Sequence, residues 1–332
     1  MAKTHFLSFI IPVYNEAESL AALCSEIVTV AGKHRYRYEI IIINDGSTDT
    51  TQGVIEQLAR RSKKIVSAEF RRNLGKARAL QLGFELARGD VIVTLDGDLQ
   101  DDPQEIPKLL AKIDEGYDVV SGWKLRRLDP PYRVVSSRIF NVLYDLCFGL
   151  TIHDSNSGFK AYRQEAVKTL RIYGELHRFI PALLVSRGFK VGEAVVKHRA
   201  RKFGRSKYSN FKFISGLFDF ATVMYLTKFQ DRAFHFFGSI GSIMFGTGLS
   251  ISGYLSFSKI VFGHPLSNRP LLLLAMLLMT LGGQVALFGL LAEQIYRLDF
   301  NRNRSAWIKK MVGGRRGKKE HQRQDYNRPS SR

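Results

Sequence analysis

Carboxylate side chains follow three apolar segments in the first third of the chain, and their spacing suits a cation and a phosphorylated ligand. Asp96 and Asp98 come directly after the run 91–95, Asp45 follows the run 39–43, and Asn15-Glu16 follows the run 6–13. Two carboxylates one residue apart can share a hard divalent cation with a diphosphate. Acidic turns are common and mostly solvated, so the informative feature is that these carboxylates stand where buried strands are expected to end.

The segments that must position these carboxylates alternate between strand and helix patterns. Apolar runs predict strands at 6–11, 39–43, 65–70 and 91–95, and helical spacing predicts helices at 16–30, around 54–58 and at 76–87. Strands separated by helices of this length are typical of an α/β fold, here a Rossmann-like, mostly parallel sheet with helices on both faces. Ligands of such sheets bind beyond the carboxyl ends of the strands. The three acidic sites fall at those ends.

The second half of the chain changes character at about Phe211. Residues 211–229 are largely apolar with a narrow polar stripe, which predicts an amphipathic helix in the membrane interface. The stripe consists of Lys212, Ser215, Asp219 and Thr222. Two longer apolar stretches, 233–262 and 270–296, each exceed the roughly 20 residues that a helix needs to cross a bilayer. The short link between them favours an antiparallel helical hairpin, and a buried hairpin in a large soluble domain is the alternative.

The formal net charge of the chain is +20, and positive charge is concentrated at the C-terminal end. The residues beyond Leu298 are rich in Lys and Arg, whereas Arg269 is the only Lys or Arg in the link between the two apolar stretches. By the positive-inside rule, the tail and the N-terminal part are both cytoplasmic. Cys24 and Cys147 lack the spacing of a metal site or a disulfide framework, which fits a reducing compartment. We therefore expect a cell-membrane protein with two spans.

Four motifs, in their order and spacing, resemble the inverting nucleotide-sugar glycosyltransferases of family 2, which have the A-type fold. The motifs are Ile11-Pro12-Val13-Tyr14-Asn15-Glu16, Asn44-Asp45-Gly46-Ser47-Thr48-Asp49, Arg72-Asn73-Leu74-Gly75-Lys76 and Asp96-Gly97-Asp98-Leu99-Gln100-Asp101-Asp102-Pro103. The last motif is similar to that of dolichyl- and polyprenyl-phosphate sugar transferases. The resemblance continues through 154–160 and 201–208 and covers about 5–297, so the basic tail lies outside it. Gly97 stands where the family more often has Ala.

The resemblance implies an enzyme that transfers a sugar, with inversion, from a UDP- or GDP-linked hexose to a polyprenyl or dolichyl phosphate. It implies a nucleotide-sugar site of Pro12, Tyr14, Glu16, Asp45, Asn73, Lys76 and Asp96, in which Asp45 bonds the base. It also implies that Asp96 and Asp98 bind Mg²⁺ or Mn²⁺, and that Asp98, Asp154 and Gln100 act near the reacting centre. A divalent ion stabilises the charge that develops on the leaving diphosphate. The sugar, the base and the prenyl chain remain open.

Four basic residues and one serine in the middle of the chain are the candidates for binding the acceptor phosphate. They are Arg127, Arg133, Ser137, Arg201 and Lys207. Arg133, Ser137 and Asn141 recur every four residues, so a helix presents all three on one face. The planar guanidinium of Arg is well shaped for a phosphate. A solvated basic helix is the alternative interpretation.

These expectations divide the chain into four parts. They are a cytoplasmic catalytic domain at 1–210, a juxtamembrane amphipathic helix at 211–232, a transmembrane hairpin at 233–297 and a basic cytoplasmic tail at 298–332. Membrane lipids are the expected partners of the hairpin and the tail. Gly238, Gly241, Gly246 and Gly248 allow close helix packing within the hairpin or between protomers of a homo-oligomer. His153 and His177 are interpreted as structural histidines rather than as catalytic bases.

Three other functions compete with this interpretation. A processive polysaccharide synthase carries a Gln-x-x-Arg-Trp motif before its spans. The nearest sequence here, 294–298, lacks the Trp and stands at the end of the second apolar stretch. A nucleic-acid-binding membrane protein is suggested by the basic tail, but the tail shows no such motif, and attraction to anionic lipids explains it more simply. Nucleic acid is therefore not an expected partner. A catalytically inactive scaffold that presents lipid to a partner is disfavoured by the intact acidic set.

Overall fold

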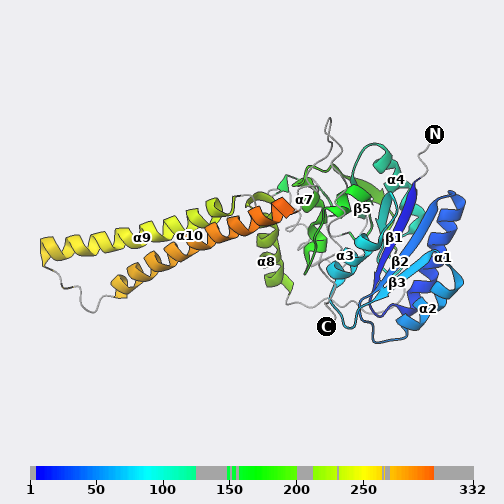
Figure 1. Ribbon diagram of the computed structural model, residues 1–332, viewed down its shortest axis with the longest axis horizontal. Coiled ribbons are helices and arrows are strands. Elements are labelled where there is room, and N and C mark those ends of the chain that lie inside the picture. Colours follow the sequence, from blue (N-terminus) through cyan, green and yellow to red (C-terminus); the bar gives the residue numbers. More distant parts are fainter. Residues whose placement is uncertain are drawn as a thin grey trace, which may run out of the picture.

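A computed structural model describes residues 5–124, 148–149, 152–154, 157–199, 212–229, 232–263, 265 and 270–302 of the chain. The N-terminal part forms an α/β unit, and two long helices extend from it side by side (Figure 1). The predicted acceptor-site residues Arg127, Arg133, Ser137, Arg201 and Lys207 lie outside the described residues. Their roles therefore remain predictions.

A seven-stranded sheet forms the centre of the α/β unit. Its strands are β1 (Phe6–Val13), β2 (Arg37–Asn44), β3 (Ile65–Glu69), β4 (Val91–Thr94), β5 (Val119–Lys124), β6 (Lys160–Arg163) and β7 (Val191–Val196). They lie in the order β3-β2-β1-β4-β6-β5-β7. Within this sheet, β6 pairs antiparallel with β4 and β5, and the other pairs are parallel. The predicted α/β class with a mostly parallel sheet is confirmed.

Helices cover both faces of the sheet, as predicted. They include α1 (Ala17–Lys33), α2 (Thr51–Arg61), α3 (Lys76–Leu86), η1 (Pro103–Glu105), α4 (Ile106–Asp114), α6 (Gln164–Lys168), η2 (Leu176–Phe179) and α7 (Ile180–Val185). Successive residues of a strand point to opposite faces. Accordingly, Phe9 of β1 packs in the cluster that contains α1 and α4, whereas Ile10 packs in the cluster that contains α3.

The strands β5, β6 and β7 are the part of the sheet that the sequence pattern does not single out. The antiparallel strand β6 lies between β4 and β5, although 65 residues separate it from β4 along the chain. It begins at Lys160, which is only 2% exposed. A charged residue interrupts the apolar pattern by which a buried strand is recognised. Its burial here needs polar partners, which the candidate site provides.

The predicted amphipathic segment 211–229 forms the helix α8 (Lys212–Met224), which continues as a π-helical turn, η3 (Tyr225–Phe229). Phe218 is 69% exposed, whereas Val223 is fully buried. Phe220 packs on Phe179 of η2, with ring centroids 6.4 Å apart, and joins the cluster that covers one face of the sheet. One side of α8 therefore completes the wall of the α/β unit, and part of its other surface is exposed and apolar.

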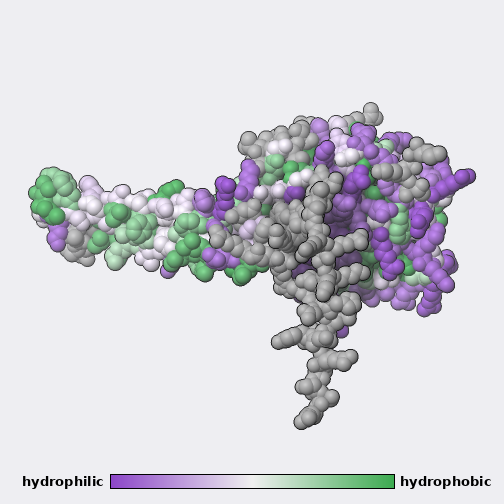
Figure 2. Space-filling view, turned by 45° about the horizontal axis from the view of Figure 1, so that its top comes forward, coloured by the Kyte–Doolittle hydropathy of each residue, from purple (hydrophilic) through white to green (hydrophobic). Residues whose placement is uncertain are grey.

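The two long helices are α9 (Ala233–Phe262) and α10 (Pro270–Arg302), and both are long and apolar enough to cross a membrane. In the most apolar 18-residue stretch of each helix, only 17% (α9) and 11% (α10) of the residues are buried. The two helices are therefore not the core of a soluble domain formed by the described residues. Figure 2 shows apolar side chains along this extension and a mostly hydrophilic surface on the α/β unit. The hairpin therefore provides two candidate spans.

Glycines allow the two helices to approach closely. A Cβ added to Gly241 lies 2.5 Å from the carbonyl oxygen of Gly282, and one added to Gly248 lies 2.6 Å from that of Ala275. Gly246, by contrast, has nothing within 4 Å of an added Cβ. Gly241 and Gly248 are therefore used inside the hairpin, and the expected contact between protomers stays a prediction.

Candidate active site

The carboxyl ends of β1, β2 and β4 bring the predicted acidic residues to one edge of the sheet. The amide of Asp45 donates to the carbonyl of Val13 at 2.8 Å, which ties the end of β2 to the end of β1. The amide of Asn15 donates to the hydroxyl of Ser47 in the loop after β2, and the amide of Glu16 donates to the hydroxyl of Thr51 at the start of α2, at 3.0 Å each. These three strands are parallel neighbours, so their ends share one edge, as the alternating pattern predicts.

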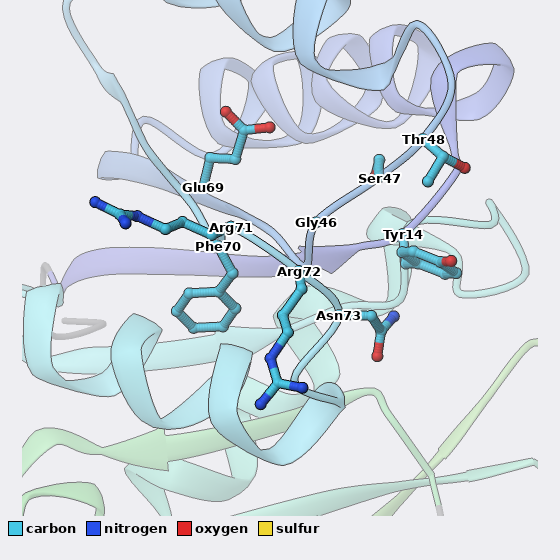
Figure 3. Close-up of a pocket in the computed structure, with 9 residues that line it drawn as sticks. All are labelled: Tyr14, Gly46, Ser47, Thr48, Glu69, Phe70, Arg71, Arg72 and Asn73. Atoms are coloured by element: carbon cyan, nitrogen blue, oxygen red, sulfur yellow. The ribbon is translucent and has the colours of Figure 1, made fainter.

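A cavity of about 610 Å³ lies beside these strand ends (Figure 3). It is lined by Tyr14, Gly46, Ser47, Thr48, Glu69, Phe70, Arg71, Arg72 and Asn73. Tyr14 and Asn73 were expected in a nucleotide-sugar site. Phe70 and Arg71 are additional lining residues, and their position directly after β3 is the signal that locates them, because β3 ends at the same edge of the sheet.

Two loops meet closely at the floor of this cavity. Gly46 has a φ of +67°, and a Cβ added there lies 2.4 Å from the backbone carbon of Arg72. Glycine is therefore required at this turn by both the backbone conformation and the contact. Asp45 strengthens the same contact, because its carboxylate accepts from the amides of Leu74 at 2.7 Å and Gly75 at 3.0 Å.

The carboxylate of Asp45 thus holds the loop that carries Asn73. Burial raises the pKa of Asp45 above its ordinary value, and the two amide hydrogen bonds lower it in part. The expected contact between Asp45 and a base remains a prediction. Pro12 lies within β1, and Glu16 precedes α1, where its carboxylate accepts from the Ser19 hydroxyl at 3.1 Å.

Asp96 follows β4 and forms a short ion pair with Lys76, the first residue of α3. Burial pushes the pKa of Asp96 upward, but the positive charge and hydrogen bond of Lys76 prevail and lower this pKa to about 2. Gly158 packs against the same carboxylate, because a Cβ added there lies 2.4 Å from Asp96 Oδ2. The segment 154–160, which contains Gly158, therefore lies next to the motif that begins at Asp96. Two motifs that are far apart in the sequence thus meet at one site.

Asp98 is 7% exposed, and its Oδ1 accepts from the amide of Gln100 at 3.2 Å. Between them, Leu99 has a φ of +62°, a left-handed conformation that costs a non-glycine residue of order 1 kcal/mol or more and is often found at functional sites. The side chain of Gln100 lies 3.4 Å from His198. The loop after β4 is thus fixed in a sharp turn that presents both acidic residues.

Two lysines and one histidine that the sequence interpretation did not assign to the site lie around these carboxylates. Lys124 pairs with Asp101 at 2.8 Å; burial opposes the charge of Lys124, but Asp101, Asp96 and Asp154 raise its pKa. Burial lowers the pKa of Lys160 to about 8, although Asp154 opposes this. Burial, together with the nearby charge of Lys76, also lowers the pKa of His177 well below its usual range. His177 is therefore neutral and adjoins the site, a placement that its sequence context did not indicate.

The donor set suits a cation that shares its ligands with a substrate. Asp96 and Asp98 offer hard carboxylate oxygens, but the described residues contain no group of three or more His, Cys, Asp or Glu side chains that can hold a metal ion. Mg²⁺ is usually bound through one or two carboxylates together with substrate phosphates and water. The two carboxylates fit such a cation, although Lys76 competes for Asp96.

The similarity of this chain to known proteins agrees with this geometry. Residues 8–171 match the model of the family described as glycosyl transferase family 2. The chain is 34% identical over 296 residues to the dodecaprenyl-phosphate galacturonate synthase of Rhizobium johnstonii, with 88% of each chain covered. This chain belongs to glycosyl transferase family 2.

A second relative within this family is the undecaprenyl-phosphate 4-deoxy-4-formamido-L-arabinose transferase of Pseudomonas savastanoi pv. phaseolicola. It is 34% identical over 311 residues, with 92% of this chain and 91% of the relative covered. Among solved structures, the glucosyl-3-phosphoglycerate synthase of Mycobacterium tuberculosis in complex with uridine diphosphate has a TM-score of 0.51. The two chains are 19% identical, and the match covers 66% of this chain and 80% of the synthase. This structural similarity confirms the expected A-type fold.

Proposed function

We propose that this family 2 glycosyltransferase moves a sugar from a nucleoside diphosphate to a polyprenyl phosphate at the membrane surface. The observation that carries the proposal is the match to the Rhizobium enzyme, which covers 88% of this chain and is named for a dodecaprenyl phosphate. The exposed apolar hairpin supports it, because a lipid-linked acceptor is available only at a membrane.

In the proposed reaction, an oxygen of the acceptor phosphate attacks the anomeric carbon, and the bond between that carbon and the nucleoside diphosphate breaks. The attack comes from the face opposite the leaving group, so the configuration inverts. A phosphate monoester has a second pKa of about 6 and is already an oxyanion at neutral pH. The acceptor therefore needs no general base, and we assign Asp154 the role of orienting the sugar or a neighbouring cation.

The donor is proposed to bind along the edge formed by β1, β2 and β4. The cavity beside Tyr14 and Asn73 receives the nucleoside, and Lys76 contacts the diphosphate near Asp96. A bound Mg²⁺ or Mn²⁺ stabilises charge on the departing diphosphate. Asp96 and Asp98 are the residues that hold it, with Gln100 beside them. Whether the donor carries uridine or guanosine is decided by assay below.

The acceptor is proposed to reach the site from the side of α8. Arg127, Arg133, Ser137, Arg201 and Lys207 are proposed to bind its phosphate. Both the α/β unit and the basic tail are proposed to face the cytoplasm, because the basic residues of the chain flank the hairpin on that side. Attraction to anionic lipids contributes about 1 kcal/mol for each basic residue near the surface.

The test uses the full-length protein in liposomes, with a panel of UDP- and GDP-sugars and with undecaprenyl or dolichyl phosphate as acceptor. We expect release of nucleoside diphosphate and formation of a lipid-linked sugar only when the prenyl phosphate is present. Asp98→Asn, or removal of divalent cations with EDTA, should abolish turnover. Asp114→Asn is the matched control, because Asp114 pairs with His5 away from the site. Full turnover by Asp98→Asn would contradict the proposed role of this carboxylate.

A further inference from the structure

Two residues that face each other on neighbouring strands hold the backbone of Asp154. Ser121 of β5 and Glu193 of β7 are register partners in a parallel pair. The hydroxyl of Ser121 donates to the carbonyl of Asp154 at 3.1 Å, in a buried hydrogen bond. Oε1 of Glu193 accepts from the amide of Asp154 at 3.1 Å. Both polar groups of the Asp154 peptide backbone are thus bound by side chains from the sheet.

The same strands also hold the preceding residue, His153. The second carboxylate oxygen of Glu193 lies 2.9 Å from Nδ1 of His153. Trp123 lies two residues beyond Ser121 and therefore points to the same face of β5. Its ring stacks on His153, with centroids 4.0 Å apart and an angle of 14° between the planes. The segment 152–154 is consequently fixed by hydrogen bonds to its backbone and by packing on its side chain.

The position of Asp154 matters because its carboxylate belongs to the charged cluster of the site. Asp154 is 2% exposed and interacts electrostatically with Lys124 and Lys160, which are also buried or nearly so. A displacement of about 1 Å in a group that orients a reactant can lower a rate by about a hundredfold. The hydrogen bonds of Ser121 and Glu193 are made to the backbone of Asp154 and not to its carboxylate.

We infer that Glu193 and Ser121 are positioning residues, which act on sugar transfer by fixing the Asp154 backbone beside Lys124 and Lys160. This inference rests on the proposed function, in which Asp154 orients the sugar or a neighbouring cation. Neither residue reaches the substrate in this role. Glu193 fixes the amide, Ser121 fixes the carbonyl, and together they set the direction in which the carboxylate points.

The test compares kcat and KM for variants of the full-length protein in liposomes. Glu193→Ala should lower kcat by about ten- to a hundredfold and leave the apparent KM for the nucleotide sugar near the wild-type value. Glu193→Gln keeps an oxygen that can accept from the Asp154 amide, so it should restore most of the lost kcat. Val195→Ala is the control on the same strand, because Val195 is 46% exposed and lies beyond the contact with Asp154.

A double-variant cycle separates positioning from a general structural effect. In an Asp154→Asn background, Glu193→Ala should cause little further loss, because the group that Glu193 positions is already inactive. Losses that multiply in the double variant would overturn the inference. If Glu193→Ala does not fold, Ser121→Ala removes a single hydroxyl and should lower kcat by about three- to tenfold, again with no further loss in the Asp154→Asn background.

The outcomes also distinguish this inference from the proposed function. A wild-type protein that forms no lipid-linked sugar from any donor in the panel contradicts the proposed function. An active wild type whose rate falls with Asp154→Asn, but not with Glu193→Ala or Ser121→Ala, contradicts only the positioning role.

Discussion

Lys76, the first residue of α3, forms an ion pair with Asp96, the residue that follows Leu95 beyond the end of β4. A divalent cation bound to Asp96 must share the carboxylate with this ammonium group. Lys76→Met removes the competitor, so we expect the Mn²⁺ concentration that gives half-maximal activity to fall by about three- to tenfold. The same variant should have a lower kcat/KM for the nucleotide sugar, because a cation near the diphosphate is lost.

A titration of activity against Mn²⁺ checks this expectation. Lys112→Met is the matched control, since Lys112 pairs with Glu115 at the C-terminal end of α4, the end opposite the loop that carries Asp96 and Asp98. A requirement for more Mn²⁺ in Lys76→Met would show that Lys76 supports the cation rather than competing with it.

The second prediction concerns the acidic limb of the pH–rate profile. Asp154→Asn should lower kcat by about a hundredfold, because a misplaced reactant reacts slowly. The acidic limb should persist near pH 6, because it reports the second ionisation of the acceptor phosphate and not a protein base. Measurement of kcat between pH 5 and 8 for wild type and variant decides the matter. Loss of that limb in the variant would identify Asp154 as the proton acceptor.

The third prediction compares two glycines of the same helix. Gly241→Ala places a Cβ 2.5 Å from the carbonyl oxygen of Gly282, so we expect it to destabilise the hairpin by about 1–3 kcal/mol. Gly246→Ala meets no atom within 4 Å and should be neutral or slightly stabilising, because Ala is the better helix former. Thermal unfolding in detergent gives both values. Equal effects of the two substitutions would mean that the α9–α10 contact does not limit stability.

The fourth prediction concerns Cys24, which packs in the core on α1 and is 3% exposed. Burial raises the pKa of its thiol from 9.0 to about 12, and the thiolate is the reactive form. In a Cys147→Ser variant, Cys24 should resist iodoacetamide at pH 8 in the native state and react readily in guanidinium chloride. Rapid labelling of the native protein would show that α1 opens.

The same shift fixes the sign of a pH effect on stability. Above pH 9 the unfolded chain loses the Cys24 proton while the folded chain keeps it. The contribution of Cys24 to the free energy of unfolding is therefore complete below pH 9 and is lost as the pH rises toward about 12. Denaturant titrations of Cys147→Ser and of Cys24→Ala in the same background should converge as the pH rises through this range.

The first half of the fold could be predicted because its strands are local and apolar. In β1, Phe9 and Ile10 point to opposite faces and are both fully buried, which gives a continuous apolar run. The carboxylates that follow the runs of β2 and β4 then mark where these strands end. The resemblance added the residues of the site, and the structure brings Asp45, Asp96 and Asp98 to one edge.

The rest of the fold and site could not be predicted, because it depends on contacts between parts of the chain that are far apart in the sequence. The strand β6 starts at Lys160, and a lysine in a buried strand is compatible with the fold only because Asp154 and Asp96 lie near it. The position of His177 beside Lys76 follows from the packing of η2 against α3, which no local pattern reveals. The contact of Glu193 with Asp154 likewise requires the register of β5 and β7.

The packing of α8 has a consequence for how the protein is made. Val223 and Phe220 close the face of the sheet that Phe179 and its neighbours would otherwise leave open. When the first 210 residues have left the ribosome, this face of the core is still uncovered, and the residues that cover it emerge shortly before the first apolar helix. Chains generally fold from the N-terminus during synthesis, and uncovered apolar surface invites aggregation. Because α8 directly precedes α9 in the sequence, the core is completed at almost the same time as the nascent chain is delivered to the membrane.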